Sequence, residues 1–123
     1  MLENELKFSP YIADAVVIGD ARKFLTCLVM IDQENVEHFA QKHSVPFTDY
    51  RSLCAQAEIV ELIGAEVARV NKEFSSVEQV KKFRLIDVLL TAEDEELTPT
   101  MKLKRSFVGR KYSDLIDSMY GSD

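Results

Sequence analysis

The chain has 123 residues, of which 46% are hydrophobic and 29% are charged, and its formal net charge at pH 7 is −6. This length and composition favour one globular domain with a real core over a disordered segment. The acidic balance argues against nucleic-acid binding, which rests mainly on cationic contacts to phosphate. No apolar run approaches transmembrane length and the acidic start is not typical of a signal peptide, so we expect a cytoplasmic protein.

The first part of the chain predicts a short helix followed by two strands. Residues 2–11 favour a helix that ends at Ser9-Pro10, because proline disfavours helical backbone in the residue before it. Two apolar runs of strand length follow at 15–18 and 24–31, separated by the turn signal Gly19-Asp20. The link between them is short, and we therefore expect the two strands to be antiparallel neighbours.

The middle of the chain is predicted to be helical. Asp32 is a good N-cap for a helix that stops before Ser44-Val45-Pro46, and Thr48 or Asp49 can cap the next helical region. Gly64 lies in the following apolar stripe, where glycine costs about 1 kcal/mol relative to alanine, so we expect a close packing contact there. The stripe consists of Ile59, Leu62, Ile63, Val67, Val70 and Phe74.

The last part predicts a strand, a polar loop and an amphipathic helix. Residues 80–90 alternate between two faces, as in a strand. An acidic run at 93–96 and a basic segment at 97–105 follow, and residues 107–119 carry a helical apolar pattern. This order of elements indicates an α+β domain with a small sheet of about three strands flanked by helices.

The cysteines and histidines do not suggest a metal site. Cys27 and Cys54 lie in apolar company without metal-ligand spacing, which predicts small buried side chains rather than nucleophiles or disulfide partners. His38 and His43 are five residues apart and therefore fall on different faces of a helix.

The segment Leu97-Thr98-Pro99-Thr100-Met101-Lys102-Leu103-Lys104-Arg105 is the most informative stretch of the chain. A lysine on a polar turn between a strand and a helix start can reach an anion outside its own domain. Its ammonium is a compact point charge on a flexible stem, suited to phosphate or carboxylate. The alternative is a solvated basic turn, which is the commoner meaning of a charge run.

Four segments, in order and at matching separations, resemble the C-terminal domain of the adenylate-forming enzymes, specifically the long-chain acyl-CoA synthetases (fatty-acid–CoA ligases). They are ENELKFSPYI at 3–12, AVVIGDARKFLTCLVMID at 15–32, VEQVKKFRLI at 77–86 and LTPTMKLKR at 97–105. In that family the last motif carries the lysine required for adenylation, and its Lys-x-x-Arg ending matches Lys102 to Arg105. The resemblance thus implies that Lys102 is catalytic. Met101 stands where the family usually has glycine, which keeps Lys104 open as the alternative.

The resemblance also implies a reaction. A fatty-acid carboxylate attacks the α-phosphate of ATP to give an acyl-adenylate, and the thiol of coenzyme A then displaces AMP, with the small domain swinging between the two steps. By the same similarity, Arg22 and Lys82 would meet phosphates of coenzyme A and Phe83 would lie against its nucleotide. The alternative for these three residues is a solvated surface charge or ordinary packing.

The resemblance further implies that residues 1–123 form a single lid domain, with the large N-terminal adenylation domain lying outside this chain. ATP, Mg²⁺ and coenzyme A would then belong to the parent enzyme, and we expect no cofactor and no ligase activity on this chain alone. The expected partners are the N-terminal domain of the same polypeptide and, as substrates, fatty acid and coenzyme A. Peripheral association of the parent with a membrane is compatible with this interpretation. Two alternatives remain: a free-standing interaction or regulatory domain of the same fold without catalysis, and the lid of a ligase for a different carboxylic acid.

Overall fold

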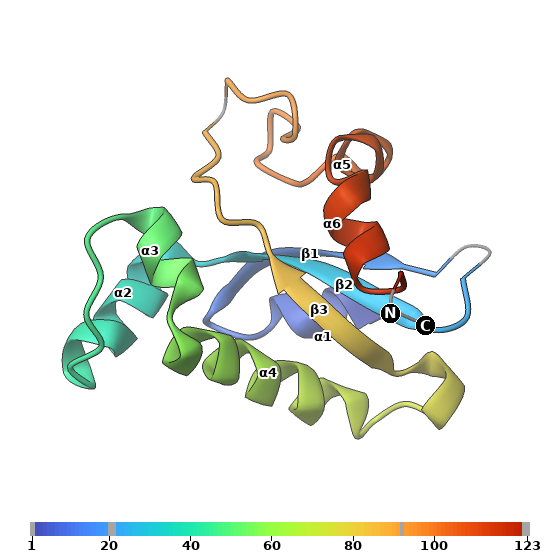
Figure 1. Cartoon of the computed structure of the whole chain (residues 1–123), viewed down its shortest axis with the longest axis horizontal. Helices are drawn as coiled ribbons and strands as arrows, with labels where there is room; N and C mark the ends of the chain where they lie inside the picture. Colours follow the sequence, from blue (N-terminus) through green and yellow to red (C-terminus); the bar gives the residue numbers. More distant parts are fainter. Residues whose placement is uncertain (1, 20–21, 92, 122–123) are drawn as a thin grey trace.

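The computed structural model describes residues 2–19, 22–91 and 93–121 of the chain. Its elements are α1 (Leu2–Lys7), β1 (Ile12–Ile18), β2 (Leu25–Ile31), α2 (Gln33–Lys42), α3 (Tyr50–Ala55), α4 (Ala57–Asn71), the 3₁₀ turn η1 (Ser76–Glu78), β3 (Val80–Leu85), α5 (Arg105–Lys111) and α6 (Ser113–Ser118). Figure 1 shows α4 running along one side of the sheet and α5 and α6 lying on the other. The predicted α+β class, a small sheet flanked by helices, is confirmed.

The sheet has the strand order β1-β2-β3. β1 pairs antiparallel with β2, as the short link between them predicted, whereas β2 pairs parallel with β3. A parallel neighbour requires a long crossover, which the chain from α2 to α4 provides. The pairing of β1 with β2 shifts register between Ile12 and Asp14. The predicted turn after β1 includes Asp20, which lies outside the described residues.

Each face of the sheet has its own apolar core, because successive side chains of a strand point to opposite faces. The large core lies on the face that α1 and α4 cover, and its buried members include Leu6, Val29, Ile59 and Ile63. The small core lies under α5 and α6, and its buried members include Leu28, Ile86, Val108 and Met119.

Local sequence signals set the helix starts as predicted. The Asp32 carboxylate accepts a hydrogen bond from the Asn35 N–H at 3.0 Å and caps α2. Asp49, rather than Thr48, caps α3, and its carboxylate and the Ser52 hydroxyl form a reciprocal capping box. The expected contact at Gly64 is also present, because the Phe83 ring lies over it. A Cβ added to Gly64 would be 3.5 Å from that ring, an ordinary van der Waals distance.

The last predicted strand and the last predicted helix differ from the sequence pattern. The strand predicted at 80–90 ends at Leu85, because its pairing with β2 ends at Val29, and Ile86 lies in the small core. The single helix predicted at 107–119 is wrong: α5 and α6 are separate, and Tyr112 between them has φ −103° and ψ 23°. At this break the Tyr112 hydroxyl donates a hydrogen bond to Glu96. The spacing of apolar residues gives no indication of this contact.

The cysteines behave as predicted. Cys27 and Cys54 are both buried and neither is bridged. Burial raises the pKa of the Cys54 thiol to about 11 and also raises the pKa of Cys27, so both thiols stay protonated at neutral pH. None of the helices in the described part of the chain has the length and apolar character needed to cross a membrane.

Candidate functional site

The candidate site is built on residues 97–104, which we name the lysine turn. Leu97 and Leu103 form an isolated antiparallel bridge that closes the base of the turn. Above it, the Thr98 N–H donates to the Lys102 carbonyl at 2.7 Å, and the Met101 N–H donates to the Thr98 carbonyl at 2.8 Å. The Thr98 hydroxyl also accepts a hydrogen bond from the Lys102 N–H at 3.1 Å. Both backbone polar groups of Lys102 are therefore bound to Thr98, which fixes the peptide from which its side chain projects.

The residue before this lysine has an unusual backbone. Met101 has φ 67°, in the left-handed region that favours glycine. A side chain in this region costs of order 1–3 kcal/mol. The turn thus has a conformational reason for the glycine that the adenylate-forming family usually has at this point.

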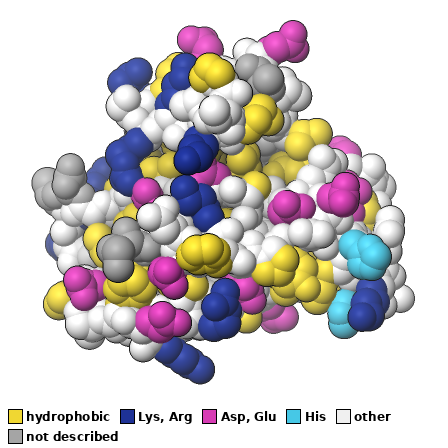
Figure 2. Space-filling model, turned by 180° about the vertical axis from the view of Figure 1, so that it is seen from behind, with side chains coloured by type: hydrophobic (Ala, Val, Ile, Leu, Met, Phe, Trp, Pro, Cys, Tyr) yellow, Lys and Arg dark blue, Asp and Glu magenta, His cyan; other side chains and the backbone are white. Residues whose placement is uncertain are grey.

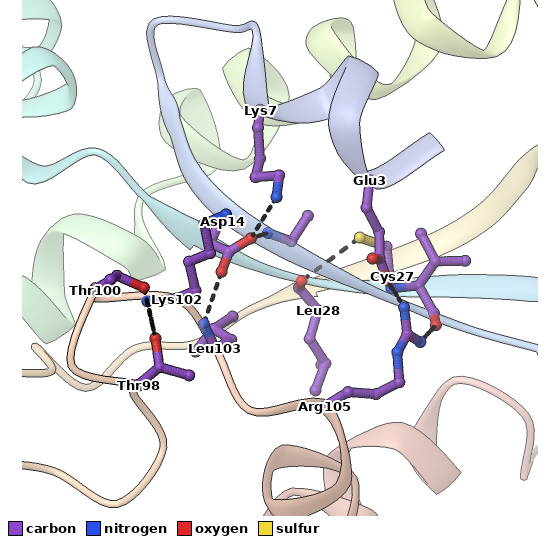
Figure 3. A network of polar contacts seen from close by, with 12 residues as sticks. Glu3, Lys7, Asp14, Cys27, Leu28, Thr98, Thr100, Lys102, Leu103 and Arg105 are labelled. Carbon is purple, nitrogen blue, oxygen red and sulfur yellow. Dashed lines mark hydrogen bonds and ion pairs between the residues drawn. The ribbon is translucent and has the colours of Figure 1, made fainter. Parts of the chain in front are cut away.

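Two contacts tie the lysine turn to the rest of the domain next to Lys102. The buried carboxylate of Asp14, on β1, accepts the Leu103 N–H at 2.7 Å. On the far side, the Lys104 N–H donates to the Glu96 carbonyl at 2.7 Å. Figure 3 shows the first of these contacts, with Leu103 of the turn pointing its N–H at Asp14.

The side chain of Arg105, the first residue of α5, binds other residues of the same domain. Its guanidinium donates to the Val17 carbonyl at 2.7 Å and forms an ion pair with the carboxylate of Glu3 on α1. The same carboxylate accepts the Val17 N–H at 2.8 Å. Arg105 therefore anchors the end of the lysine turn to β1 and α1, as Figure 3 shows.

Glu96 anchors the other end of the turn. It is 2% exposed, and its carboxylate accepts hydrogen bonds from the Lys111 ammonium at 2.7 Å and from the Tyr112 hydroxyl at 2.9 Å. Desolvation raises the pKa of Glu96, but the hydrogen bonds from Lys111 and Tyr112 outweigh it and leave the pKa below its ordinary value. Glu96 is thus a charged, buried link between the turn and the junction of α5 and α6.

Lys102 and Lys104 are both exposed, and neither side chain makes a hydrogen bond or ion pair with the residues that the structure describes. Their surroundings differ. Lys102 lines an open hollow of about 530 Å³ together with Lys7, Asp14 and Met30, whereas Lys104 does not line it. Figure 2 shows Lys and Arg side chains gathered on the upper part of the molecule, the end that carries the lysine turn and α5.

The structure brings together two of the three residues predicted to contact coenzyme A. The Arg22 guanidinium lies 4.8 Å from the Tyr120 ring centroid and 3.0 Å from an oxygen of Asp117. The Lys82 ammonium lies 5.8 Å from the Phe24 ring centroid, and the rings of Phe24 and Tyr120 are 4.7 Å apart. Arg22 and Lys82 therefore flank one aromatic pair beside α6.

Phe83, the third of these residues, is separate from that pair. It packs against the large core, on the side of the sheet that α4 covers. There it lines a different hollow, of about 350 Å³, with Cys54, Val60 and Asp87 among its neighbours.

Sequence reasoning missed the three carboxylates that hold the turn. Glu3 lies in a segment that resembled the family and Asp14 lies directly before another, but their partners Arg105 and Leu103 are 102 and 89 residues away along the chain. No feature of the neighbouring sequence predicts contacts between residues so far apart in the chain. Glu96 was noted only as part of the acidic run at 93–96, and its position directly before the apolar Leu97 sets it apart from the other three acids.

Comparison with known proteins identifies the family. Residues 1–123 match the family model described as the AMP-binding enzyme C-terminal domain. The chain belongs to this family. The predicted resemblance to the C-terminal domain of adenylate-forming enzymes is thereby confirmed.

The curated relatives of this AMP-binding C-terminal domain are much longer proteins. It is 36% identical to the long-chain-fatty-acid–CoA ligase FadD15 of Mycobacterium tuberculosis, over 100% of this chain and 21% of the relative. It is 31% identical to human long-chain-fatty-acid–CoA ligase 6, over 97% of this chain and 17% of the relative. The chain therefore spans about a fifth of the length of these ligases.

Solved structures share the fold. The adenylation domain of a carboxylate reductase from Mycobacterium chelonae superposes with a TM-score of 0.69 at 24% identity, over 98% of this chain and 17% of that one. The A domain of a carboxylic acid reductase from Segniliparus rugosus gives the same TM-score at 18% identity, over the same shares of the two chains. Both likenesses concern the fold alone.

Proposed function

We propose that this domain is the mobile C-terminal lid of a long-chain fatty-acid–CoA ligase and that Lys102 assists its adenylation step. The observation that carries the proposal is the contrast between the backbone and the side chain of Lys102. Its backbone is held by Thr98 on both polar groups, while its ammonium has no partner among the described residues. Such a side chain is arranged to meet an anion from outside the domain.

The chemistry needs a cation at this point. In the adenylation step a carboxylate oxygen bonds to the α-phosphorus of ATP, and the bond from that phosphorus to the leaving pyrophosphate breaks. Negative charge gathers on the oxygens of both groups. An ammonium placed between them stabilises that charge, and removing one preorganised electrostatic group commonly costs about 10²–10³ in rate. In the second step the thiol of coenzyme A bonds to the acyl carbon, loses its proton, and AMP leaves.

Lys102 is the better candidate than Lys104 on local geometry. Lys102 lines the open hollow beside β1, together with Asp14 and Met30. Lys104 precedes α5, and its backbone N–H is bound to Glu96. The two lysines differ in sequence by two positions but face different surroundings, which makes Lys104 a matched control for Lys102.

We further propose that Arg22 and Lys82 meet phosphates of coenzyme A in the second step. They flank the Phe24–Tyr120 pair on one side of the sheet. Arg22 would exchange its ion pair with Asp117 for phosphate, and exposed pairs of this kind contribute only about 0–1 kcal/mol, so the exchange costs little. Phe83 is left out because it packs on the α4 side.

ATP, Mg²⁺ and most contacts to fatty acid are assigned to the N-terminal domain that we propose for the parent polypeptide. Mg²⁺ prefers carboxylate oxygens and water in octahedral geometry. The described residues contain no cluster of three or more His, Cys, Asp or Glu side chains suited to a metal ion. The contribution that we propose for this chain is the lysine turn and the Arg22–Lys82 surface. Closure and rotation of such a domain is a known way to run two half-reactions in one site.

The experiment compares three proteins. The full-length polypeptide that carries this domain, a version lacking the domain and the 123-residue chain alone are each given fatty acid, ATP, Mg²⁺ and coenzyme A, and acyl-CoA is measured by mass spectrometry. We expect product from the full-length protein only. Turnover by the chain alone, or undiminished turnover without the domain, would overturn the lid assignment. Product from a short-chain or aryl acid but not from a long-chain acid would replace the proposed substrate.

A further inference from the structure

Asp14 is a buried residue of β1 whose carboxylate binds mainly backbone N–H groups. It is 5% exposed. One oxygen accepts the Ala15 N–H at 2.8 Å, the other accepts the Leu103 N–H at 2.7 Å, and the Lys7 ammonium lies 3.7 Å from the first. Figure 3 shows the carboxylate between Lys7 and the lysine turn.

The contact to Leu103 is placed where it affects Lys102 most. The hydrogen bonds between Thr98 and Lys102 fix the internal shape of the turn. They do not fix how the turn sits on the sheet. The Leu103 N–H belongs to the peptide that follows Lys102, and Asp14 binds it from β1. Arg105 and Glu96 anchor the two ends of the turn, and Asp14 is the side chain that ties the peptide directly after Lys102 to β1.

Burying a carboxylate is costly unless hydrogen bonds compensate it, and an apolar residue would fill a strand position at lower cost. Two charge-assisted hydrogen bonds to backbone N–H groups provide that compensation here. Since both bonds are short and directional, the carboxylate holds the two backbone segments at a fixed separation. This is the property that a residue needs if it is to orient a catalytic group.

We propose that Asp14 is a positioning residue for Lys102: by holding the Leu103 N–H against β1, it sets where the Lys102 ammonium stands in the adenylation step. Asp14 acts through the backbone and does not touch the reacting atoms. This assignment rests on the function proposed above for Lys102. A purely structural Asp14 would affect both half-reactions only through folding, whereas a positioning Asp14 affects adenylation selectively.

The hydrogen bond is tested first in the unmodified 123-residue chain. We expect an NMR scalar coupling across the hydrogen bond between the Leu103 amide nitrogen and the Asp14 carboxylate carbon, together with a slowly exchanging Leu103 amide. The two N–H groups are bound by separate oxygens of Asp14, and in Asp14→Asn one of these oxygens becomes an NH2 donor, so one N–H loses its acceptor. In this variant the Leu103 or Ala15 amide should exchange about tenfold faster. Lys7→Met is the control that keeps both acceptors, and it should change neither amide. Absence of the coupling in the unmodified chain would overturn the proposal.

The role in catalysis is tested in the full-length enzyme. Displacement of a catalytic group by about 1 Å can cost roughly 10²-fold in rate. We therefore expect Asp14→Asn to lower acyl-adenylate formation by about 10- to 100-fold and to spare thioester formation from supplied acyl-adenylate. Asp49→Ala, which removes the capping box of α3, is the control for general destabilisation and should leave the ratio of the two half-reactions unchanged.

The outcomes separate this proposal from the one on which it rests. If the unmodified full-length enzyme forms no acyl-adenylate, the proposed function fails. If that enzyme is active and Lys102→Ala is not, yet Asp14→Asn behaves like Asp49→Ala, then Asp14 does not position Lys102. A selective loss of adenylation in Asp14→Asn supports the assignment.

Discussion

The two faces of the sheet are held by different forces. The face that α1 and α4 cover packs through the large core, whose members include the fully buried Ile59 and Ile63. The face that α5 and α6 cover has a smaller apolar core and is tied down by carboxylates as well: Glu96 holds Lys111 and Tyr112, and Asp14 holds Leu103.

This difference separates what keeps the domain folded from what orients its lysine turn. Apolar contacts are strong in sum but non-directional. Hydrogen bonds to buried carboxylates add less net stability but fix distances and directions. The lysine turn lies on the face with the carboxylates. We infer that the α4 face supplies most of the stability and the opposite face supplies orientation.

The largest effect should come from the α4 face. Ile63 is fully buried, and Ile63→Ala should lower the free energy of unfolding by about 2–5 kcal/mol through lost burial and a cavity. Urea unfolding followed by circular dichroism measures this change. Lys102→Ala, at an exposed position, is the matched control and should stay within about 0.5 kcal/mol of the unmodified chain. A smaller loss of unfolding free energy for Ile63→Ala than for Lys102→Ala would contradict the inference that the α4 face supplies most of the stability.

The next effect concerns the buried carboxylate on the other face. Glu96→Gln should lower the free energy of unfolding at pH 7 by about 1.5–3 kcal/mol, because charged hydrogen bonds to Lys111 and Tyr112 become neutral or are lost. The measurement is urea unfolding of the two proteins across a range of pH.

The stability difference between the unmodified chain and Glu96→Gln should depend on pH, and its sign follows from the pKa of Glu96. The folded-state pKa of Glu96 is lowered, so its contribution to stability is complete above the unfolded-state pKa of about 4.3. That contribution is lost as the pH falls through the lower folded-state pKa. The stability difference between the unmodified chain and Glu96→Gln should therefore shrink on acidification. A difference that grows on acidification would mean that Glu96 is neutral in the folded chain.

The smallest expected change in stability comes from a substitution on the α4 face. Gly64 lies inside α4, and a Cβ there would be in ordinary contact with the Phe83 ring at 3.5 Å. Gly64→Ala should therefore raise the free energy of unfolding by up to about 1 kcal/mol through helix propensity. Thermal unfolding measures this gain. A loss of stability would show that the Phe83 ring has no room to accept the methyl group.

The sequence predicted those elements whose signals are local. Asp32 and Asp49 mark helix starts because their side chains cap backbone groups three residues away. The strand at Leu25–Ile31 and the antiparallel pairing with its neighbour follow from an apolar run and a short link. These features depend on neighbours in the chain, and so a single sequence is enough to recognise them.

The parts that sequence reasoning missed depend on distant partners. β3 ends at Leu85 because its pairing with β2 ends there, and the break at Tyr112 coincides with the hydrogen bond from its hydroxyl to Glu96. Lys102 was found through the family motif, whereas Asp14 was not, because its contact to Leu103 spans 89 residues. The strained φ of Met101 gives a structural meaning to the one position at which this motif departs from the family pattern.

The central claim is that a fixed turn presents Lys102 to the adenylation step. The most direct measurement compares the two half-reactions in full-length Lys102→Ala and Lys104→Ala. We expect Lys102→Ala to lower acyl-adenylate formation by about 10²–10³ and to spare thioester formation from supplied acyl-adenylate. Lys104→Ala should retain both activities. Equal loss of both half-reactions in Lys102→Ala, or a selective loss of adenylation in Lys104→Ala instead, would contradict the account.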